Sequence, residues 1–139
     1  MSLFNVFDVS GSGLKAQSIR LNTTASNLAN ADSVSSNFND TYRARKPVFA
    51  AVLDQTTNQD PSAVKVAVKG IVESDAPLRR EYNPNSPFAN KDGYVFKPNV
   101  NVMEEMADMI SASRSYQTNV QVADAAKQML NSTLSLGKS

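Results

Sequence analysis

The sequence contains neither cysteine nor histidine among its 139 residues. Without thiolate or imidazole side chains, the chain cannot form a disulfide, a zinc finger, a Ser-His-Asp triad or a Cys-His pair. Tryptophan is also absent, and aromatic residues make up only 7% of a chain that is 41% hydrophobic. Any compact core is therefore expected to be modest. We expect no catalytic residues, no metal and no cofactor.

A strong charge of one sign and a long hydrophobic run are missing as well. Fourteen basic and 13 acidic residues leave a formal net charge of +1, which gives no reason to expect a nucleic-acid partner. The longest apolar run, VFAAVL at residues 48–53, is far shorter than the roughly 20 residues of a membrane span. The first 13 residues have no basic start and no long apolar run, so we expect no cleaved signal peptide. The expected partner is protein, without membrane insertion.

One long helix is predicted over residues 101–136, where neither glycine nor proline occurs. Asn101 followed by Glu104 fits a capping box, and Gly137 marks the end. Apolar residues follow the alternating spacing of four and three that is typical of a helical seam. The seam comprises Val102, Met106, Met109, Ser113, Tyr116, Val120, Ala123, Lys127, Leu130 and Leu134. Such a helix would be about 54 Å long, so we expect other molecules to cover much of it.

A second helical stripe is predicted near the N-terminus. Its apolar members recur every seven residues, at Phe7, Leu14, Leu21 and Leu28. Gly11 and Gly13 each disfavour helix by about 1 kcal/mol, so we expect frayed first turns or a start at a serine within residues 10–12. Asn27 and Asn30 mark the end of the stripe, because asparagine is favoured where helices close.

The segment between the helices is predicted to be a small, turn-rich β unit. Residues 31–62 are polar and irregular, which predicts mostly loop with one short strand. AVKVAVKGIV at residues 63–72 alternates valine with lysine, the pattern of a strand with one wet face. Asp92-Gly93 favours a hairpin turn between LRREY and YVFK.

Several patterns permit a chemical site, but each has a simpler explanation. Glu104 and Asp108 share one helix face, as a metal or acid–base pair would, yet acidic residues at a helix start complement the helix dipole. The VSGSGLK stretch at residues 9–15 lacks the Walker spacing of a phosphate-binding loop. The basic YRARK stretch at residues 42–46 could contact RNA, but in a neutral protein it is more often an exposed edge or a subunit contact.

Long stretches of the chain resemble the bacterial flagellar basal-body rod proteins, in particular a proximal rod protein. They are TTASNLANADS at residues 23–33, YRARKPVFAAVL at 42–53, residues 70–122 with PNVNVMEEMADMISASRSYQTN, and AKQMLNSTLSLG at 126–137. The resemblance covers nearly the whole chain. It departs at ADSVSSNFND, residues 31–40, where a glycine or proline is expected.

The resemblance implies a structural subunit of the rod that crosses the periplasm and transmits torque, and it implies no enzymatic activity. It also implies helical assembly with copies of itself and other rod proteins, and export through the flagellar type III apparatus without a cleaved signal. The alternative is another type III-exported helical adaptor or axial component. A third class, a small hydrolase that uses carboxylates alone, would need a pair of buried acidic residues.

The expected fold is mainly α with a small β part, in which the terminal helices pair as an antiparallel coiled-coil-like unit. Residues 1–30 and 101–139 would form the terminal helical domain of the inner tube, and residues 31–100 a linker and a small β-rich outer unit. The predicted assembly interface comprises Leu14, Leu21, Asn27, Leu28, Asn30, Met106, Met109, Tyr116, Val120, Leu130 and Leu134. Within this interface, we expect a substitution at Leu130 to be the best single probe of assembly. Because lone amphipathic helices are marginal in water, we expect the ends of the isolated chain to be largely disordered.

Overall fold

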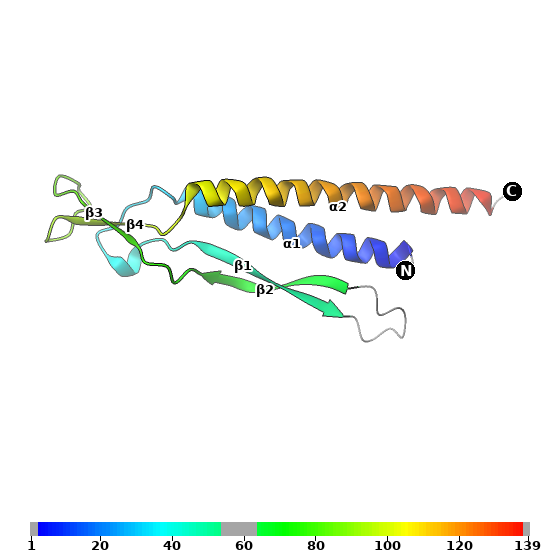
Figure 1. Cartoon of the computed structure of the whole chain (residues 1–139), viewed down its shortest axis with the longest axis horizontal. Coiled ribbons are helices and arrows are strands. Elements are labelled where there is room, and N and C mark those ends of the chain that lie inside the picture. The colour runs from blue at the N-terminus through cyan, green and yellow to red at the C-terminus, as the bar shows by residue number, and fades with distance from the viewer. Residues whose placement is uncertain (1–2, 54–63, 138–139) are drawn as a thin grey trace.

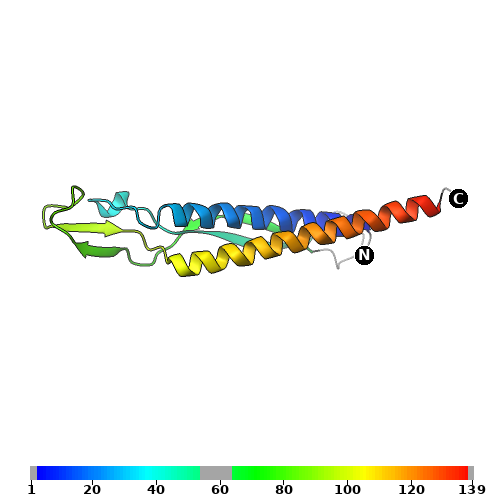
Figure 2. The same cartoon turned by 90° about the horizontal axis from the view of Figure 1, so that it is seen from above.

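Two long helices dominate the computed structural model, which describes residues 3–53 and 64–137. Helix α1 (Leu3–Ala29) and helix α2 (Val102–Leu136) lie side by side and run antiparallel, so the start of α1 and the end of α2 lie at the same end of the molecule (Figure 1). The expected mainly α fold with a small β part is therefore confirmed. Helix α2 extends past the start of α1 (Figure 2).

A two-stranded antiparallel hairpin forms a third layer. Strands β1 (Arg45–Leu53) and β2 (Val64–Glu73) both contact α1, on the side opposite α2, so α1 is the middle layer (Figure 1). The strand predicted from the alternating valines is confirmed, whereas β1 is longer than the short strand expected. An isolated two-stranded ribbon is at best marginally stable in water, so its packing along α1 is what stabilises it.

A second small hairpin lies at the end of the molecule farthest from the start of α1 and the end of α2 (Figure 2). It pairs β3 (Arg79–Tyr82) with β4 (Tyr94–Lys97), as expected from LRREY and YVFK. The connection spans residues 83–93, so Asp92-Gly93 closes only its last turn. Gly93 has φ of 80°, a backbone conformation that glycine adopts without strain. Phe38 of a 3₁₀ turn at Phe38–Asp40 packs edge-to-face against Phe96 of β4, and Ser35 forms a bridge with Phe96.

The ends of α1 differ in part from the expectation. The helix begins at Leu3 and continues through both glycines, so of the two alternatives the later start at Ser10 or Ser12 is wrong, while fraying of the first turns stays a prediction. The Ser12 hydroxyl donates to the Val9 carbonyl at 2.7 Å instead of capping a new helix. The predicted end is confirmed, and the Asn30 side-chain amide donates to the Ser26 carbonyl at 2.8 Å. The same carbonyl also accepts from the Asn30 backbone amide at 3.2 Å, so Asn30 holds the last turn of the helix through two donors.

The limits predicted for α2 agree with the structure, but the capping box is incomplete. Asn101 is the N-cap, and its side-chain oxygen accepts from the Met103 amide at 3.2 Å. The Glu104 carboxylate does not close the box, because it accepts a hydrogen bond from Lys46 Nζ at 2.7 Å. Gly137 caps the C-terminus, where its amide donates to the Thr133 carbonyl.

The core is as modest as the composition suggested. The largest side chains that are almost completely buried are Asn27 and Pro98. One small cluster, formed by Ala31, Ala44 and Val100, lies where α1, β1 and α2 meet. Many large apolar side chains are consequently left on the surface of the described residues.

Candidate assembly surface

The line along which α1 faces α2 is defined by two close approaches. Arg20 donates to the Asp108 carboxylate at 2.6 Å. Gly13 lies so close to Asn119 that a methyl group on Gly13 would be 2.9 Å from Asn119 Nδ2. On α2 the contacting column repeats every seven residues, as Glu105, Ala112, Asn119 and Ala126. Two of these four side chains are alanines, and together with Gly13 of α1 they let the two helices approach closely.

The structure divides the predicted seam of α2 into two columns. Met109 and Leu130 lie in the column that adjoins α1 and are half-buried, whereas Tyr116 of the same column is exposed. The other column, with Met106, Val120 and Leu134, is turned aside and is 48%, 37% and 60% exposed. The small residues Ala112 and Ala126, both fully buried, occupy the place that this second column was expected to fill.

The leucine stripe of α1 lies on a flank of the helix pair. Gly13 marks the side of α1 that faces α2. At about 100° per residue, Leu14, Leu21 and Leu28 are turned around the helix by roughly 60–100° from that side, and all three are half-buried. The hairpin contacts α1 on the other flank, where the Ser12 hydroxyl accepts from the Val66 amide at 3.1 Å. The leucine flank of α1 is therefore not covered by the hairpin.

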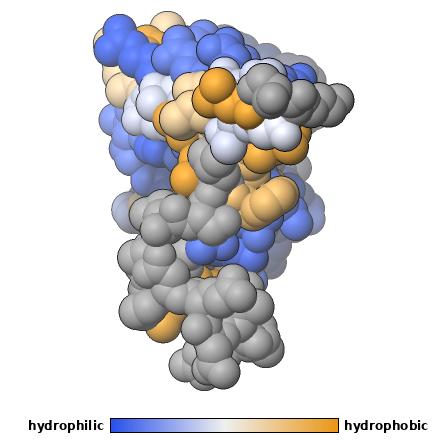
Figure 3. All heavy atoms as spheres, turned by 90° about the vertical axis from the view of Figure 1, so that its right-hand side faces the viewer, coloured by the Kyte–Doolittle hydropathy of each residue, from blue (hydrophilic) through white to orange (hydrophobic). Residues whose placement is uncertain are grey.

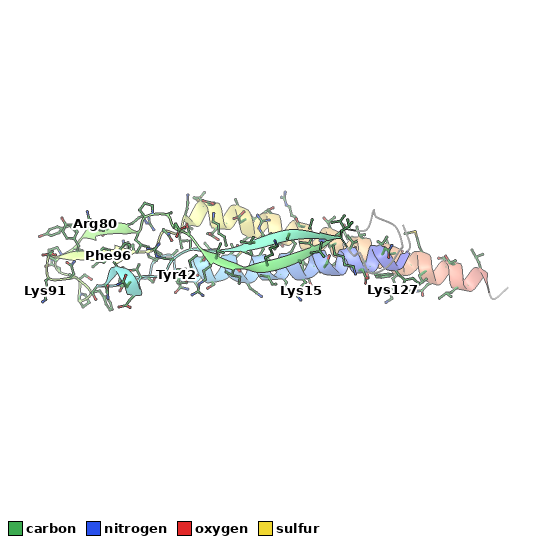
Figure 4. The ribbon with its side chains drawn as sticks, turned by 90° about the horizontal axis from the view of Figure 1, so that it is seen from below. Lys15, Tyr42, Arg80, Lys91, Phe96 and Lys127 are labelled. Atoms are coloured by element: carbon green, nitrogen blue, oxygen red, sulfur yellow. The ribbon has the colours of Figure 1, made fainter. Side chains whose placement is uncertain are left out.

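Two predicted interface residues, Asn27 and Asn30, use their side-chain amides for hydrogen bonds inside the chain. Asn27 is 1% exposed. Its side chain bonds the backbone of Arg45 and accepts from the Tyr42 hydroxyl at 2.9 Å. Tyr42 lies where the helical part meets the β part (Figure 4). The Asn30 amide bonds its own helix, so any effect of Asn27 or Asn30 on assembly would be indirect.

The remaining predicted residues form two groups by exposure. Leu14, Leu21, Leu28, Met109 and Leu130 are half-buried, whereas Met106, Tyr116, Val120 and Leu134 are exposed. Tyr116 is 38% exposed. Because Leu130 is partly covered by its own chain, a change there mixes folding with assembly. Val120 is a cleaner probe of an intermolecular contact.

Sequence reasoning missed several exposed apolar residues. On α2 these are Met103, Ile110, Val122, Met129 and Leu136. The spacing of Met103, Met106 and Ile110 at i, i+3 and i+7 was a usable signal for a second apolar surface. Figure 3 looks along the molecule onto the end where α2 terminates, and apolar residues are exposed there beside hydrophilic ones.

An ion pair links the hairpin to the first turn of α2. Lys46 Nζ lies 2.7 Å from Glu104 Oε1, and this hydrogen bond raises the pKa of Lys46 above its ordinary value of 10.5. Lys46 is therefore protonated, and able to donate to the Glu104 carboxylate, throughout the neutral pH range. Both side chains are 52% exposed, so its contribution to stability is small.

The described residues hold little that suggests reaction chemistry. One acidic side chain among them, Glu105, is buried, where the hydrolase alternative would need a pair. Within the same residues, no three His, Cys, Asp or Glu side chains come together in a way that could hold a metal ion. No helix in the described part of the chain is long and apolar enough to cross a membrane.

Comparison with known proteins identifies the class. Residues 7–35 match the family model for the flagella basal body rod protein, and residues 91–136 match the model for the C-terminal part of the flagellar basal body rod FlgEFG proteins. These matches cover most of α1 and all of α2, together with residues 30–35 and 91–101 next to them. The chain therefore falls in the class of flagellar rod proteins, and both helices belong to the matched parts.

Individual relatives are similar over the full length. The flagellar basal-body rod protein FlgC of Salmonella typhimurium is 49% identical over 138 residues, covering 99% of this chain and 100% of the relative. FlgC of Escherichia coli O157:H7 is 48% identical over 140 residues with the same coverage, and FlgC of Aquifex aeolicus is 41% identical over 138 residues, covering 99% of each chain. The chain belongs to the FlgC family of flagellar basal-body rod proteins. It is a structural subunit of the flagellar basal-body rod, which confirms the resemblance found in the sequence.

Proposed function

We propose that the chain builds the rod by lateral packing of its helix pair against copies of itself and other rod proteins. The supporting observation is the exposed apolar surface of α2, where ten large hydrophobic residues are exposed and only Glu105, Ala112 and Ala126 are buried. Exposed apolar surface on this scale favours association, because covering it removes it from water. The predicted interface residues on the flank of the helix pair, Met106, Tyr116 and Val120 among them, would be covered in this way.

In this proposal, residues 1–30 and 101–139 form a coiled-coil-like inner tube, and residues 31–100 form the outer part. Long helices packed side by side resist twisting of the assembly, as a torque-transmitting shaft across the periplasm requires. The chain would leave the cell unfolded through the flagellar type III apparatus without a cleaved signal. The absence of cysteine suits this route, because no disulfide has to form or open. The role is structural, without enzymatic activity.

The alternative is a type III-exported helical adaptor that binds one partner. An adaptor would be a folded monomer with fixed stoichiometry, whereas a rod subunit gains helical order as it assembles with copies or with other rod proteins. The thin core around Ala31, Ala44 and Val100 favours the rod subunit, because it gives the free chain little to fold around.

The test compares Val120→Asp with Gln121→Asp, each made as the sole copy of the chain in flagellated cells. Both changes place one new carboxylate on an exposed position of the same helix turn. If neighbours cover Val120, its carboxylate is buried unpaired at a cost of several kcal/mol per subunit. We expect Val120→Asp to be secreted but absent from isolated basal bodies, with motility lost, and Gln121→Asp to be motile. Normal motility of the Val120→Asp strain would contradict the proposal.

A further inference from the structure

The β3–β4 hairpin and the 3₁₀ turn beside it stand apart from the helices (Figure 1). We call this part, residues 35–40 and 79–97, the tip. Among the described elements, β3 and β4 make extensive contact only with each other, whereas α1 contacts α2 and both strands of the β1–β2 hairpin. The tip is therefore held by the segments that connect it. Figure 4 shows Tyr42 in this connecting region, between the helices and the tip with its Arg80 and Phe96.

Four short segments connect the tip to the helices and to the β1–β2 hairpin. They are residues 30–34, 41–44, 74–78 and 98–101. The apolar cluster buried where they meet consists of Ala31, Ala44 and Val100, with Tyr42 packed against it. Small side chains make few van der Waals contacts, so this cluster by itself holds the tip in no particular direction. The direction of the tip depends on hydrogen bonds between the segments, because hydrogen bonds require a defined geometry.

The side chain of Asn99 bonds two of the other connecting segments at once. Asn99 Oδ1 accepts from the Ala44 amide at 2.7 Å. Asn99 Nδ2 donates to the Ser74 carbonyl at 3.1 Å and to the Ala76 carbonyl at 2.8 Å. A side-chain amide has one acceptor oxygen and two N–H donors, so all of these groups are used. Turning the amide over would place N–H against N–H and oxygen against two carbonyls, so only this orientation fits.

Asn99 is itself held in place by its neighbours. Pro98 is almost completely buried, and its ring fixes a backbone dihedral immediately before Asn99. The Pro98 carbonyl accepts from Arg79 Nε, at the start of β3, at 3.3 Å. The Ser74 amide donates to the Ala44 carbonyl at 2.8 Å, so the two segments that Asn99 bonds are also bonded to each other.

The bonds of Asn99 continue to α1 through the next residue of the backbone. Ala44 precedes Arg45, whose amide and carbonyl are bonded to the buried side chain of Asn27. One asparagine near the end of α1 and one just before α2 therefore hold two consecutive backbone residues. Bending of the tip relative to the helices would break bonds at one of the two asparagines.

We propose that Asn99 is a positioning residue, which fixes the direction of the tip so that the tip and the helix pair turn as one body in the rod. The inference rests on the proposed function, since a subunit that transmits torque has to carry its outer part around with its helices. The donors of Asn99 hold residues 74–76, which lead from β2 into the tip. Its acceptor holds Ala44, which leads from the tip into β1. Substitution can separate these two contributions.

The test compares three variants, each made as the sole copy of the chain in flagellated cells. Asn99→Ala removes all three hydrogen bonds. Asn99→Asp keeps an acceptor for the Ala44 amide, but an ionised carboxylate cannot donate to the carbonyls of Ser74 and Ala76. Asn85→Ala, a change at an exposed asparagine of the tip, is the matched control. Isolated basal bodies are imaged at side-chain resolution, and hydrogen exchange of the Ala44 amide is measured on the same material.

We expect both Asn99 variants to show the tip spread over several directions while the helices stay as sharply defined as in the control. Exchange at the Ala44 amide should become about tenfold faster in Asn99→Ala, because one hydrogen bond is lost, and should stay unchanged in Asn99→Asp. A residue with only a general role in stability would instead blur the helices together with the tip.

A sharply defined tip in either Asn99 variant would overturn the inference while leaving the rod function intact. Helices blurred as much as the tip, or a tip blurred equally by Asn85→Ala, would also overturn it. If neither Asn99 variant enters basal bodies, the purified full chain is spin-labelled at Ala29→Cys and Asn85→Cys, both exposed positions in a chain without native cysteine. The distribution of label distances should then broaden with Asn99→Ala, and an unchanged width would overturn the inference. Absence of the unaltered chain from basal bodies would count against the proposed function instead.

Discussion

The side chain of Asn27 holds both polar backbone groups of Arg45. Asn27 Nδ2 donates to the Arg45 carbonyl at 2.8 Å, and the Arg45 amide donates to Asn27 Oδ1 at 2.9 Å. One buried amide near the end of α1 therefore fixes where β1 begins. This pairing fixes the position of the β1–β2 hairpin along α1. It therefore also determines which apolar side chains of the hairpin remain exposed.

Replacing Asn27 by alanine should loosen this junction. The change leaves the Arg45 amide and carbonyl without their side-chain partner in a partly buried place, at a cost of about 2 kcal/mol. We expect the opening free energy at the Arg45 amide, measured by hydrogen exchange, to fall by about that amount. Asn22→Ala, an exposed change on the same helix, serves as the control and should leave Arg45 protected. Equal protection of Arg45 in both variants would show that the junction does not depend on Asn27.

The two glycines of α1 should respond differently to alanine. A methyl group at Gly11 meets nothing within 4 Å, whereas at Gly13 it lies 2.9 Å from the Asn119 side chain. Alanine favours helix by about 1 kcal/mol over glycine, so Gly11→Ala should raise the helical content of the chain. Gly13→Ala should raise it less, because Asn119 must move aside. Circular dichroism of the two variants measures the difference, and an equal gain would mean that the helices do not approach closely at Gly13.

Exchanging the charges of Arg20 and Asp108, the ion pair between α1 and α2, should change the helical content only slightly. The change should depend on whether the two charges are opposite. Arg20 and Asp108 are 27% and 36% exposed, so their pairing contributes about 0.5–1 kcal/mol. Asp108→Arg should lower helical content slightly, and the added change Arg20→Asp should restore it. The effect should shrink in 1 M salt, where such pairs are screened. No restoration in the double variant would indicate that the two side chains do not pair.

The free chain should gain helical order on assembly. The fully buried apolar side chains of α2 are only the small residues Ala112 and Ala126, and uncovered helices are marginal in water. Amide exchange of the dilute chain should show weak protection at residues 5–28 and 103–134, and stronger protection in the assembled rod. Strong protection of both segments in the dilute chain would instead favour the adaptor.

Local signals explain what the sequence predicted well. Asn101 and Gly137 bound α2 as expected, because capping depends on a few neighbouring residues. The alternating valines predicted β2, because period two is a property of the strand itself. The family resemblance rested on long continuous stretches and was confirmed by relatives that cover the whole chain.

Tertiary relationships account for what the sequence did not predict. The column of α2 that contacts α1 contains Ala112 and Ala126, which permit close approach but add little to a hydrophobic pattern. The position of the hairpin along α1 depends on the buried amide of Asn27, whose partner Arg45 lies 18 residues away. Neither feature is visible in a local window of sequence.

Imaging the assembled rod at side-chain resolution tests the assembly proposal most directly. We predict that Met106, Tyr116 and Val120 are covered by neighbouring subunits, that the two helices line the inner tube, and that the hairpins lie outside it. A rod in which these three side chains face solvent, or in which residues 45–53 line the lumen, would contradict the proposal.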